Sequence, residues 1–267
     1  MKTVLIMGYG VVGKALEHLI LARNKTGVQV VKYDPHLGHE RMPEEVDAVF
    51  ICVSADTKSF KVDLSNIKDC IQRIKFKKCL IYLRSTVPPG TCAALEKEFK
   101  VKIAFMPEFL TERTAMKDVL IQNIICGGEM EHFNFLQRLF SGKNQELWKF
   151  PNESAEMGKY VHNIFGAMCV NFFNFIFNIC QELGINFDQV IAVASMSGNM
   201  STKYSQVPGP DGKYGFDGKC FPKDLAAFMG FVRKENKLRR MLDDGLGYHF
   251  LKTIMCSNQR YRGLKDD

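Results

Sequence analysis

The 267-residue sequence lacks several features that mark special classes of protein. Its nine cysteines are an odd number with no regular spacing and no Cys-x-x-Cys pair, which argues against a disulfide framework and against a zinc site. We therefore expect no metal ligands and a reducing, cytoplasmic location. The apolar run Val4 to Met7 passes directly into Gly8, so it is too short for the core of a signal peptide.

The sequence also lacks a continuous apolar run long enough to cross a membrane. Its most apolar segment, Met168 to Ile179, is shorter than the roughly 20 residues that a span needs. Asn171, Asn174 and Asn178 interrupt it at helical spacing and would form a polar stripe on one face of a helix. We expect a buried interface helix and no membrane partner.

The formal charge of +7 suits an anionic partner, but the sequence has no long basic block with interleaved aromatic residues. The densest cluster of basic residues, from Arg233 to Arg240, is broken by Glu235 and Leu238, which is typical of a solvated helix face. We therefore expect an anionic small molecule and no nucleic acid. With 46% hydrophobic residues, the chain can build one large or two ordinary domains.

The first half of the chain alternates between strand-like and helix-like segments. Lys2 to Met7 has the composition of a buried parallel strand, and a helical stretch from Lys14 to Ala22 and a second strand, Val28 to Tyr33, follow it. Further strands are expected at Ala48–Val53, Cys79–Leu83, Val101–Phe105 and Asn123–Cys126, with helices near Leu64–Ile74 and Ala93–Phe99. This order predicts an α/β fold whose N-terminal domain, residues 1–150, is a doubly wound Rossmann sheet.

A dinucleotide fingerprint, Gly-x-Gly-x-x-Gly, lies between the first strand and the first helix. Its residues are Gly8, Tyr9, Gly10, Val11, Val12 and Gly13. Gly8 permits the tight turn, Gly10 lets the backbone approach a pyrophosphate, and Gly13 allows close packing of helix on strand. Asp34, about twenty residues further on, would accept hydrogen bonds from the adenine ribose and favours NAD over NADP. The alternative is a Rossmann-like fold that binds no cofactor.

The pattern after Pro151 is helical, which predicts an all-helical central domain over residues 151–267. The expected segments are a helix ending near Leu183 at Gly184, a helix from Asp188 to Ser195, a loop from Tyr204 to Gly218, and a helix from Leu225 to the end. Glu156, Lys159 and Asn163 share one face of the first helix. A lysine and an amide one turn apart can both point at one oxygen, as an oxyanion site needs, although a surface stripe has the same spacing.

One thiol, Cys220, lies in a stretch of small and charged residues. Gly215 and Gly218 give this stretch backbone freedom, and Pro222 suits the start of a helix. We therefore expect a displayed thiol, and a nearby ammonium group such as that of Lys219 would favour its thiolate form. On its own, Cys220 has an alternative role as one more small apolar residue, which is the commoner fate of a free cysteine.

Together these segments resemble the UDP-glucose/GDP-mannose dehydrogenase family, in the family's order and across nearly the whole chain. The matching residues are Gly8–Gly13, Ser85–Thr91, Pro107–Leu110, Ala155-Glu156 with Lys159, Tyr160 and Asn163, and Cys220–Asp224. The resemblance implies a four-electron oxidation of a nucleotide-sugar primary alcohol to a carboxylate, with two NAD reduced in turn. UDP-glucose is the favoured substrate because it is the most frequent in the family.

The resemblance also implies a covalent route. Cys220 would add to the aldehyde that the first oxidation produces, and the thiohemiacetal would then be oxidised to a thioester that water hydrolyses. Lys159 and Asn163 would stabilise the alkoxides or shuttle the proton, and Asp224 would orient the thiol and water.

Two loops at the carboxyl edge of the sheet complete the expected site. By the resemblance, Glu108 is the base for thioester hydrolysis, Thr86 lies beside the hydrolytic water, and Glu112 and Lys223 contact the cofactor or position the reacting groups. The residues expected at the cofactor are Gly8, Gly10, Val11, Val12, Gly13, Asp34, Val53, Ser54, Ser85, Thr86, Glu112 and Lys223. Those expected at the substrate are Phe109, Leu110, Lys159, Asn163, Tyr204, Gly215 and Phe216.

Three features depart from the family pattern. Val53-Ser54-Ala55-Asp56 stands where the family has Val-x-Thr-Pro, which adds an acid near the cofactor's ribose and phosphates. Asp217 replaces a glycine of Gly-Phe-Gly-Gly, so it would adopt an unusual backbone angle or reshape the sugar pocket. Full-length relatives carry a second Rossmann-like domain, whereas this chain stops at Asp267; the nucleotide would then be held by residues 204–214, a second subunit or a separate chain.

The helix from Glu153 to Leu183 has more aromatic residues than one small domain can cover, so we expect a homodimer through it. Two other functions stay open. A one-step 3-hydroxyacid-type dehydrogenase shares the fold and the lysine with an asparagine one turn on, but does not need Cys220. A non-catalytic remnant would bind NAD or a nucleotide sugar and act through protein contacts.

Overall fold

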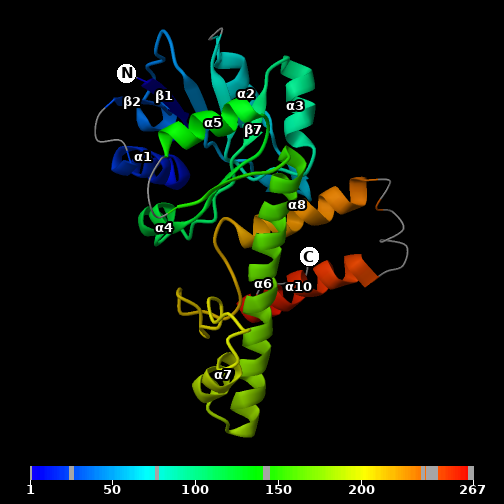
Figure 1. The fold of residues 1–267 in the computed structure, drawn as a ribbon. Coiled ribbons are helices and arrows are strands. Elements are labelled where there is room, and N and C mark those ends of the chain that lie inside the picture. The colour runs from blue at the N-terminus through cyan, green and yellow to red at the C-terminus, as the bar shows by residue number, and fades with distance from the viewer. Residues whose placement is uncertain are drawn as a thin grey trace. The chain divides into compact units, whose positions relative to one another are not determined.

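The computed structural model of the protein describes residues 2–23, 27–75, 78–140, 145–235, 238 and 246–263 (Figure 1). The chain divides into two compact units, a sheet unit of residues 1–58 and 62–159 and a helical unit of residues 59–61 and 160–267. The boundary lies inside the long helix α6 (Asn152–Leu183), later than the division at residue 150 expected from the sequence. The reason is that Asn152 and Glu156, in its first turns, are hydrogen-bonded to the sheet unit.

The sheet unit is built on a five-stranded parallel sheet with the order β2-β1-β3-β6-β7. These strands are β1 (Lys2–Met7), β2 (Val28–Tyr33), β3 (Ala48–Ile51), β6 (Leu80–Leu83) and β7 (Ile103–Phe105). The central strand β3 is fully buried and its neighbour β1 is largely buried, because their apolar runs supply side chains to both faces of the sheet. The doubly wound α/β arrangement predicted from the sequence is confirmed.

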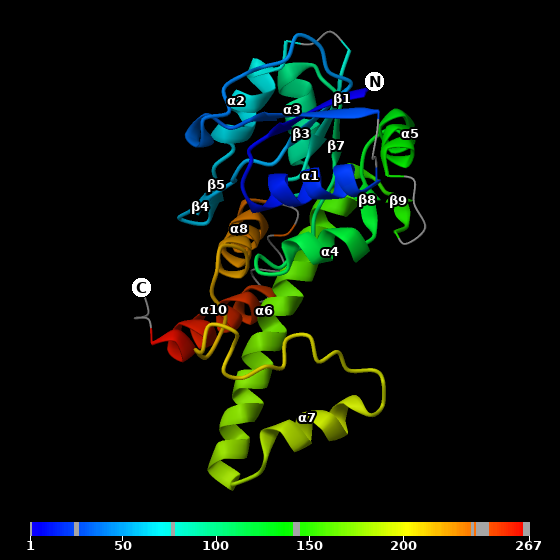
Figure 2. The same ribbon diagram turned by 90° about the vertical axis from the view of Figure 1, so that its left-hand side faces the viewer.

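Helices cover both faces of this sheet (Figure 2). Helices α1 (Val11–Arg23), α4 (Ala115–Ile121) and α5 (Met130–Leu139) pack on one face, and α2 (Ser65–Arg73) and α3 (Thr91–Phe99) pack on the other. Successive strand residues alternate between the two cores, so Phe50 and Tyr82 stack on the α1 side with ring centroids 4.7 Å apart. The carboxyl ends of all five strands therefore meet at one edge of the sheet.

Two pairs of short strands lie outside this sheet. The strand expected at Asn123–Cys126 exists as β8 (Ile124–Cys126), but it pairs with β9 (Leu147–Lys149) in a separate parallel pair. The second pair is β4 (Thr57–Lys58) and β5 (Lys61–Val62), joined through Ser59 and Phe60 at positive φ. Phe60 packs into the core of the helical unit, which explains why residues 59–61 belong to that unit.

The helical unit contains most of α6 together with α7 (Phe187–Ser195), α8 (Phe221–Lys234) and α10 (Leu246–Arg262). Gly184 ends α6 at a φ of 66°, as the sequence predicts. The expectation of one helix from Leu225 to the end is wrong. Pro222 starts α8 earlier, and α8 ends at Lys234 because Glu235 takes an extended conformation.

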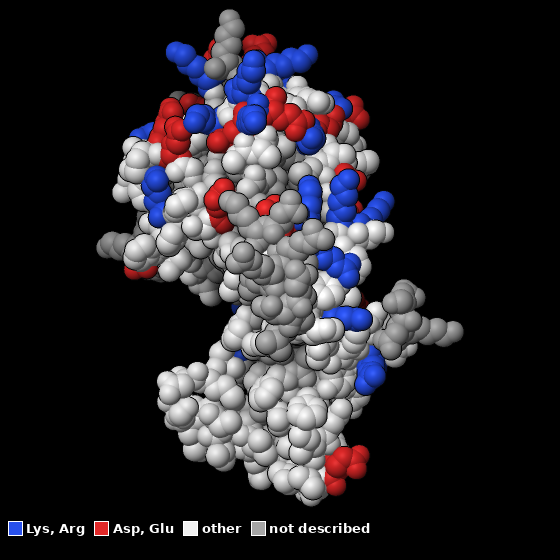
Figure 3. All heavy atoms as spheres, turned by 90° about the vertical axis from the view of Figure 1, so that its right-hand side faces the viewer, with Lys and Arg blue, Asp and Glu red and all other residues white. Residues whose placement is uncertain are grey.

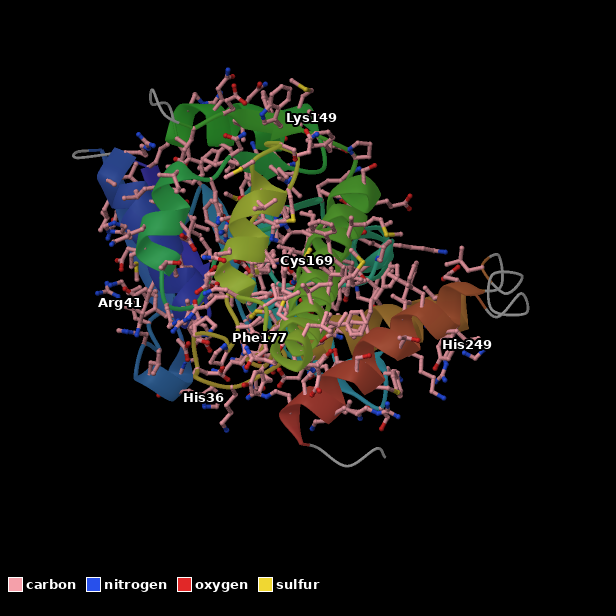
Figure 4. The ribbon with its side chains drawn as sticks, turned by 90° about the horizontal axis from the view of Figure 1, so that it is seen from below. His36, Arg41, Lys149, Cys169, Phe177 and His249 are labelled. Atoms are coloured by element: carbon pink, nitrogen blue, oxygen red, sulfur yellow. The ribbon has the colours of Figure 1, made fainter. Side chains whose placement is uncertain are left out.

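Among the described residues, α6 is the one helix long and apolar enough to cross a membrane by length and composition. Two of the asparagines expected on it are buried and hydrogen-bonded: Asn171 donates to the carbonyl of Ile254 at 2.7 Å, and Asn174 to that of Val170 at 2.8 Å. Phe177, labelled with Cys169 in Figure 4, packs edge-on against Phe187 of α7. Part of the surface of α6 is therefore buried inside the helical unit.

Candidate active site

The turn between β1 and α1 has the form that a dinucleotide needs. A Cβ on Gly8 would lie 2.8 Å from the backbone of Cys52, and one on Gly13 would lie 2.2 Å from the carbonyl oxygen of Gly8. Chain packing therefore requires both glycines. A Cβ on Gly10 would meet no atom within 4 Å, so this position is open. Since α1 begins at Val11, the open space lies at a helix N-terminus, where backbone N–H groups attract phosphate.

Asp34 directly follows β2 and is tied to the same turn. Its Oδ2 accepts a hydrogen bond from the backbone N–H of Tyr9 at 2.7 Å. This bond fixes the carboxylate beside the glycine-rich turn, which is the position from which an acid binds the adenine ribose. His36 and Arg41, labelled in Figure 4, lie on the segment that follows Asp34.

The segments that follow β3 and β6 are joined by one side chain. The hydroxyl of Ser85 donates to the carbonyl of Val53 at 2.6 Å, so the two expected cofactor segments lie side by side. Thr86 is half-buried next to this link, whereas Ser54 and Asp56 are exposed. The carboxylate that departs from the family pattern therefore faces solvent.

Lys159 and Glu108 form a largely buried ion pair in the sheet unit. The Lys159 ammonium donates to the backbone carbonyl of Glu108 at 2.5 Å and lies 3.4 Å from its Oε1. The other carboxylate oxygen of Glu108 accepts from the N–H of Leu110 at 2.7 Å. Lys159 also lies over the ring of Phe109, 5.2 Å from its centroid. Residues expected to act as base, charge stabiliser and substrate contact are thus brought together.

Two residues at the start of α6 hold Lys159 in place. The side chain of Asn152 accepts from the N–H of Phe105 at 2.7 Å and donates to the carbonyl of Ile103 at 2.8 Å, in the manner of a neighbouring strand. Glu156, three residues before Lys159, is fully buried and receives the N–H groups of Gly90 at 2.6 Å and Cys92 at 2.8 Å.

Glu156 thereby caps the N-terminus of α3, the helix that follows Thr86. Burial raises the pKa of its carboxyl, and the two N–H donors act in the opposite direction. Sequence reasoning placed Glu156 on the right helix face but gave it no role, because its partners are more than sixty residues away in the chain.

A second polar cluster lies in the helical unit. Asn163, one turn beyond Lys159 on α6, donates to Oδ2 of Asp224 at 2.6 Å, and the ammonium of Lys223 lies 2.5 Å from Oδ1. Asn163 and Asp224 are buried. Lys223 thus pairs with Asp224, so its expected contact with the cofactor stays a prediction.

Cys220 is exposed and occupies the N-cap position of α8. The backbone N–H of Asp224 donates to the Cys220 carbonyl at 2.9 Å, which closes the first turn of the helix. The sulfur therefore lies at the N-terminal end of a 14-residue helix, where the helix dipole is positive. The side chain of Cys220 is therefore exposed to solvent at the start of a helix, as the sequence predicts.

The loop that leads to Cys220 is clamped from two helices. Asn174 of α6 accepts from the N–H of Gly215 at 3.0 Å, and Asn258 of α10 exchanges two hydrogen bonds with the backbone of Phe216, at 2.6 and 2.9 Å. Asp217 does not adopt positive φ; its carboxylate pairs instead with Arg262 at 2.6 Å. The departure from glycine is thus accommodated by an ion pair and without backbone strain.

Two more of the residues expected in the site are Tyr204 and Glu112. Tyr204 packs against Phe221, with ring centroids 5.8 Å apart. Glu112 is exposed, and in the described part of the chain no hydrogen bond or ion pair links it to another side chain. Its role at the cofactor stays a prediction. Asn152, Glu156, Asn174, Asn258 and Arg262 are the supporting residues to which sequence reasoning gave no role in the site.

Two family models match the chain in order. Residues 11–142 match the NAD binding domain of the UDP-glucose/GDP-mannose dehydrogenase family, and residues 153–246 match its central domain. The chain belongs to this family. The sheet unit contains the family's NAD-binding domain, and the residues present fit NAD: the open position at Gly10 leaves room for a pyrophosphate, and Asp34 lies beside it.

This chain is also similar in sequence to individual dehydrogenases of the family. The UDP-glucose 6-dehydrogenase of Rickettsia bellii is 31% identical over 220 residues, 74% of this chain and 50% of that protein. The GDP-mannose 6-dehydrogenase of Pseudomonas aeruginosa is 29% identical over 202 residues, 68% of this chain and 45% of that protein. This chain therefore spans about half the length of these curated relatives.

The fold is shared with a solved UDP-glucose dehydrogenase from Pyrobaculum islandicum, at a TM-score of 0.78 and 22% identity. The match covers 97% of this chain and 68% of that one.

Proposed function

We propose that the protein is an NAD-dependent nucleotide-sugar dehydrogenase that oxidises a primary alcohol to a carboxylate, with UDP-glucose as the favoured substrate. The observation that supports this most is the exposed Cys220 at the N-terminus of α8, next to the buried Asn163–Asp224 pair. A one-step alcohol dehydrogenase has no use for such a thiol. Bound NAD would accept a hydride in each of the two oxidations.

Cys220 is assigned the covalent step. Its thiolate adds to the carbon of the aldehyde, so an S–C bond forms and the carbonyl oxygen becomes an alkoxide that takes up a proton as a thiohemiacetal. After the second oxidation this carbon is a thioester. Water then adds, the S–C bond breaks, the thiolate leaves, and the acid is released with its proton passed to a base.

Charge and proton transfer are assigned to residues of the two polar clusters. Lys159 and Asn163 are a cation and an amide donor one turn apart on α6, which suits two donors for an oxyanion. Asp224 holds the amide of Asn163 at 2.6 Å and so fixes which way its donor group faces. Glu108 is the proposed base for hydrolysis, because its carboxylate is held by Leu110 and Lys159.

We also propose a cytoplasmic homodimer through α6. Large apolar side chains on this helix are 39% to 66% exposed and follow one another at three, four or seven residues: Val161, Phe165, Phe172, Phe175, Ile179 and Leu183. This spacing is the one that helices use to pair with another helix. On the face in Figure 3, the sheet unit carries many charges of both signs, whereas the end of the helical unit with α7 is almost free of them. A second copy, or a separate chain, would add contacts to the nucleotide.

The covalent route is tested with two variants. Cys220→Ala should abolish acid formation, and full turnover by this variant would reject the thioester route. Glu108→Gln should let the thioester accumulate as an intact-mass increase after NAD and UDP-glucose are mixed, because hydrolysis loses its base. Normal turnover without an adduct would remove Glu108 from this role. A protein that binds NAD and nucleotide sugars without any turnover would be the non-catalytic remnant.

Light scattering on the wild type and on Phe172→Glu tests the dimer. The wild type should have twice the mass of one chain at micromolar concentration, and the buried charge should leave a monomer with an unchanged sheet unit. A monomeric wild type, or one that sediments only with lipid vesicles, would contradict the α6 dimer.

A further inference from the structure

Arg84 carries a buried guanidinium that none of the described residues neutralises. Its backbone N–H donates to the carbonyl of Ile51 at 2.9 Å, so the strand geometry of β6 continues and the side chain points to the same face as Tyr82. The residue is 4% exposed, and its Nε is sealed from solvent. In the described part of the chain, neither an ion pair nor a side-chain hydrogen bond reaches it. A buried charge without a partner is costly, so its retention calls for a ligand.

The neighbouring thiol is not the missing anion. Burial raises the pKa of Cys52 to about 12, while the charge of Arg84 lowers it and that of Glu108 raises it. Both charges therefore lie within electrostatic reach of the sulfur at the end of β3. With this pKa the thiol is neutral at physiological pH and supplies no counter-charge to the guanidinium.

The carboxylate that acts on the same sulfur is already engaged. Glu108 follows β7, the strand next to β6, and its two carboxylate oxygens face the N–H of Leu110 and the ammonium of Lys159. Lys159 is itself buried. Among the described residues, the segments at the carboxyl ends of β3, β6 and β7 thus hold two buried cations and one largely buried carboxylate. These buried groups carry an excess of one positive charge.

The position of Arg84 separates it from the cofactor's phosphates. The glycine-rich turn follows β1, and β6 is two strands away from β1 in the sheet order. Since neighbouring strands lie about 4.8 Å apart, roughly 10 Å separates the two strand ends. The excess charge is therefore at the edge that holds Lys159 and Glu108, and away from the helix N-terminus at Val11.

We propose that Arg84 binds the negatively charged oxygen that the reaction creates, and above all the carboxylate of the product. The proposal rests on the proposed function, in which a neutral alcohol becomes a carboxylate. A guanidinium matches a carboxylate with two parallel donors, whereas a CH₂OH group offers it no charge. The site then prefers the acid over the alcohol, and a later reaction that consumes the acid is needed to keep the enzyme free.

Calorimetry on the NADH-loaded full chain tests this preference. UDP-glucuronate and UDP-glucose differ at the oxidised carbon. The forward oxidation needs NAD, so neither sugar is oxidised while NADH is bound. Arg84→Gln should weaken UDP-glucuronate binding about tenfold or more and UDP-glucose binding by less than about twofold, because only the carboxylate loses a charge-assisted contact. Arg84→Lys keeps the charge and should retain part of the preference, even if the glutamine variant folds poorly.

Arg73→Gln is the matched control, because Arg73 is an exposed arginine of the same unit that pairs with Asp69. It should change neither affinity. Equal losses for both sugars in Arg84→Gln and Arg84→Lys would assign Arg84 a structural role and overturn the proposal. Weaker NADH binding with an unchanged ratio of the two sugars would assign it to a cofactor phosphate, which also overturns it.

The proposed function fails in a different way. If the wild type oxidises UDP-glucose and both Arg84 variants keep its ratio of UDP-glucuronate to UDP-glucose affinity, only the role of Arg84 is refuted. A wild type that neither binds nor oxidises UDP-glucose or GDP-mannose refutes the proposed function, and the role of Arg84 with it.

Discussion

Glu156→Gln is the sharpest test of how the sheet unit holds its candidate site. The buried carboxylate accepts the N–H groups of Gly90 and Cys92, at 2.6 and 2.8 Å. Glutamine has one acceptor oxygen, so one N–H keeps its partner and the other faces an amide that also donates. A buried donor without a partner costs about 1–3 kcal/mol. Because the variant also removes a charge from the interior, we expect a net loss of about 2 kcal/mol in the free energy of unfolding.

Urea unfolding at pH 7.5 measures this loss, and thermal unfolding should show a midpoint lower by about 4–8 °C. Glu153→Gln is the matched control, since Glu153 is exposed one turn earlier on α6 and its replacement should cost less than about 0.5 kcal/mol. Hydrogen exchange should also quicken at the start of α3. If the two variants were equally stable, the cap on α3 would contribute nothing and the reasoning would be refuted.

Three further predictions concern separate parts of the chain. Gly10→Ala should leave the melting temperature unchanged but weaken NAD binding in a fluorescence titration, because its methyl group fills the open position, whereas Gly13→Ala should destabilise the fold by about 1–3 kcal/mol. His132 is 2% exposed and burial lowers its pKa, so the unfolded chain takes up a proton at a higher pH than the folded chain does. Stability should therefore fall as the pH drops from 6.5 to 5.5, by at most about 1 kcal/mol, and His132→Phe should remove this slope in urea unfolding. Asn258→Ala should cost the helical unit about 2 kcal/mol and speed exchange of the Phe216 amide.

Each of these has a control and a contrary result. Equal loss of NAD binding and stability in both glycine variants would mean that Gly10 serves packing. His36→Phe, at an exposed position, should leave the pH slope unchanged; a slope that survives in His132→Phe would assign it to other groups. Asn178→Ala, at an exposed position of α6, should be neutral, and an unchanged Phe216 amide in Asn258→Ala would reject the clamp.

The sequence predicted the parts of the fold that local pattern determines. β1 has its expected bounds because an apolar run meets a glycine that only a tight turn accommodates, and α6 ends at Gly184 for the same kind of reason. The separate pairing of β8 with β9 was not predictable, because a short apolar strand carries no information about which sheet it joins.

In the candidate site, too, the sequence predicted only the residues that belong to a local motif. The motifs gave Lys159, Glu108 and Cys220, since each lies in a local pattern of residues with a chemical meaning. The anchors Glu156 and Asn258 were missed because their partners lie 64 and 42 residues away along the chain. A buried guanidinium such as that of Arg84 is likewise recognisable only once its surroundings are known.

The number of NADH molecules formed per nucleotide sugar tests the central claim most directly. UDP-glucose at limiting, known concentration is mixed with excess NAD and the protein, and absorbance of the reduced cofactor is read together with the mass of the product. A sugar tethered by Cys220 through both oxidations predicts two NADH per sugar and a uronate product. One NADH per sugar with a released aldehyde, or no NADH with any member of a panel of nucleotide sugars, would contradict the account.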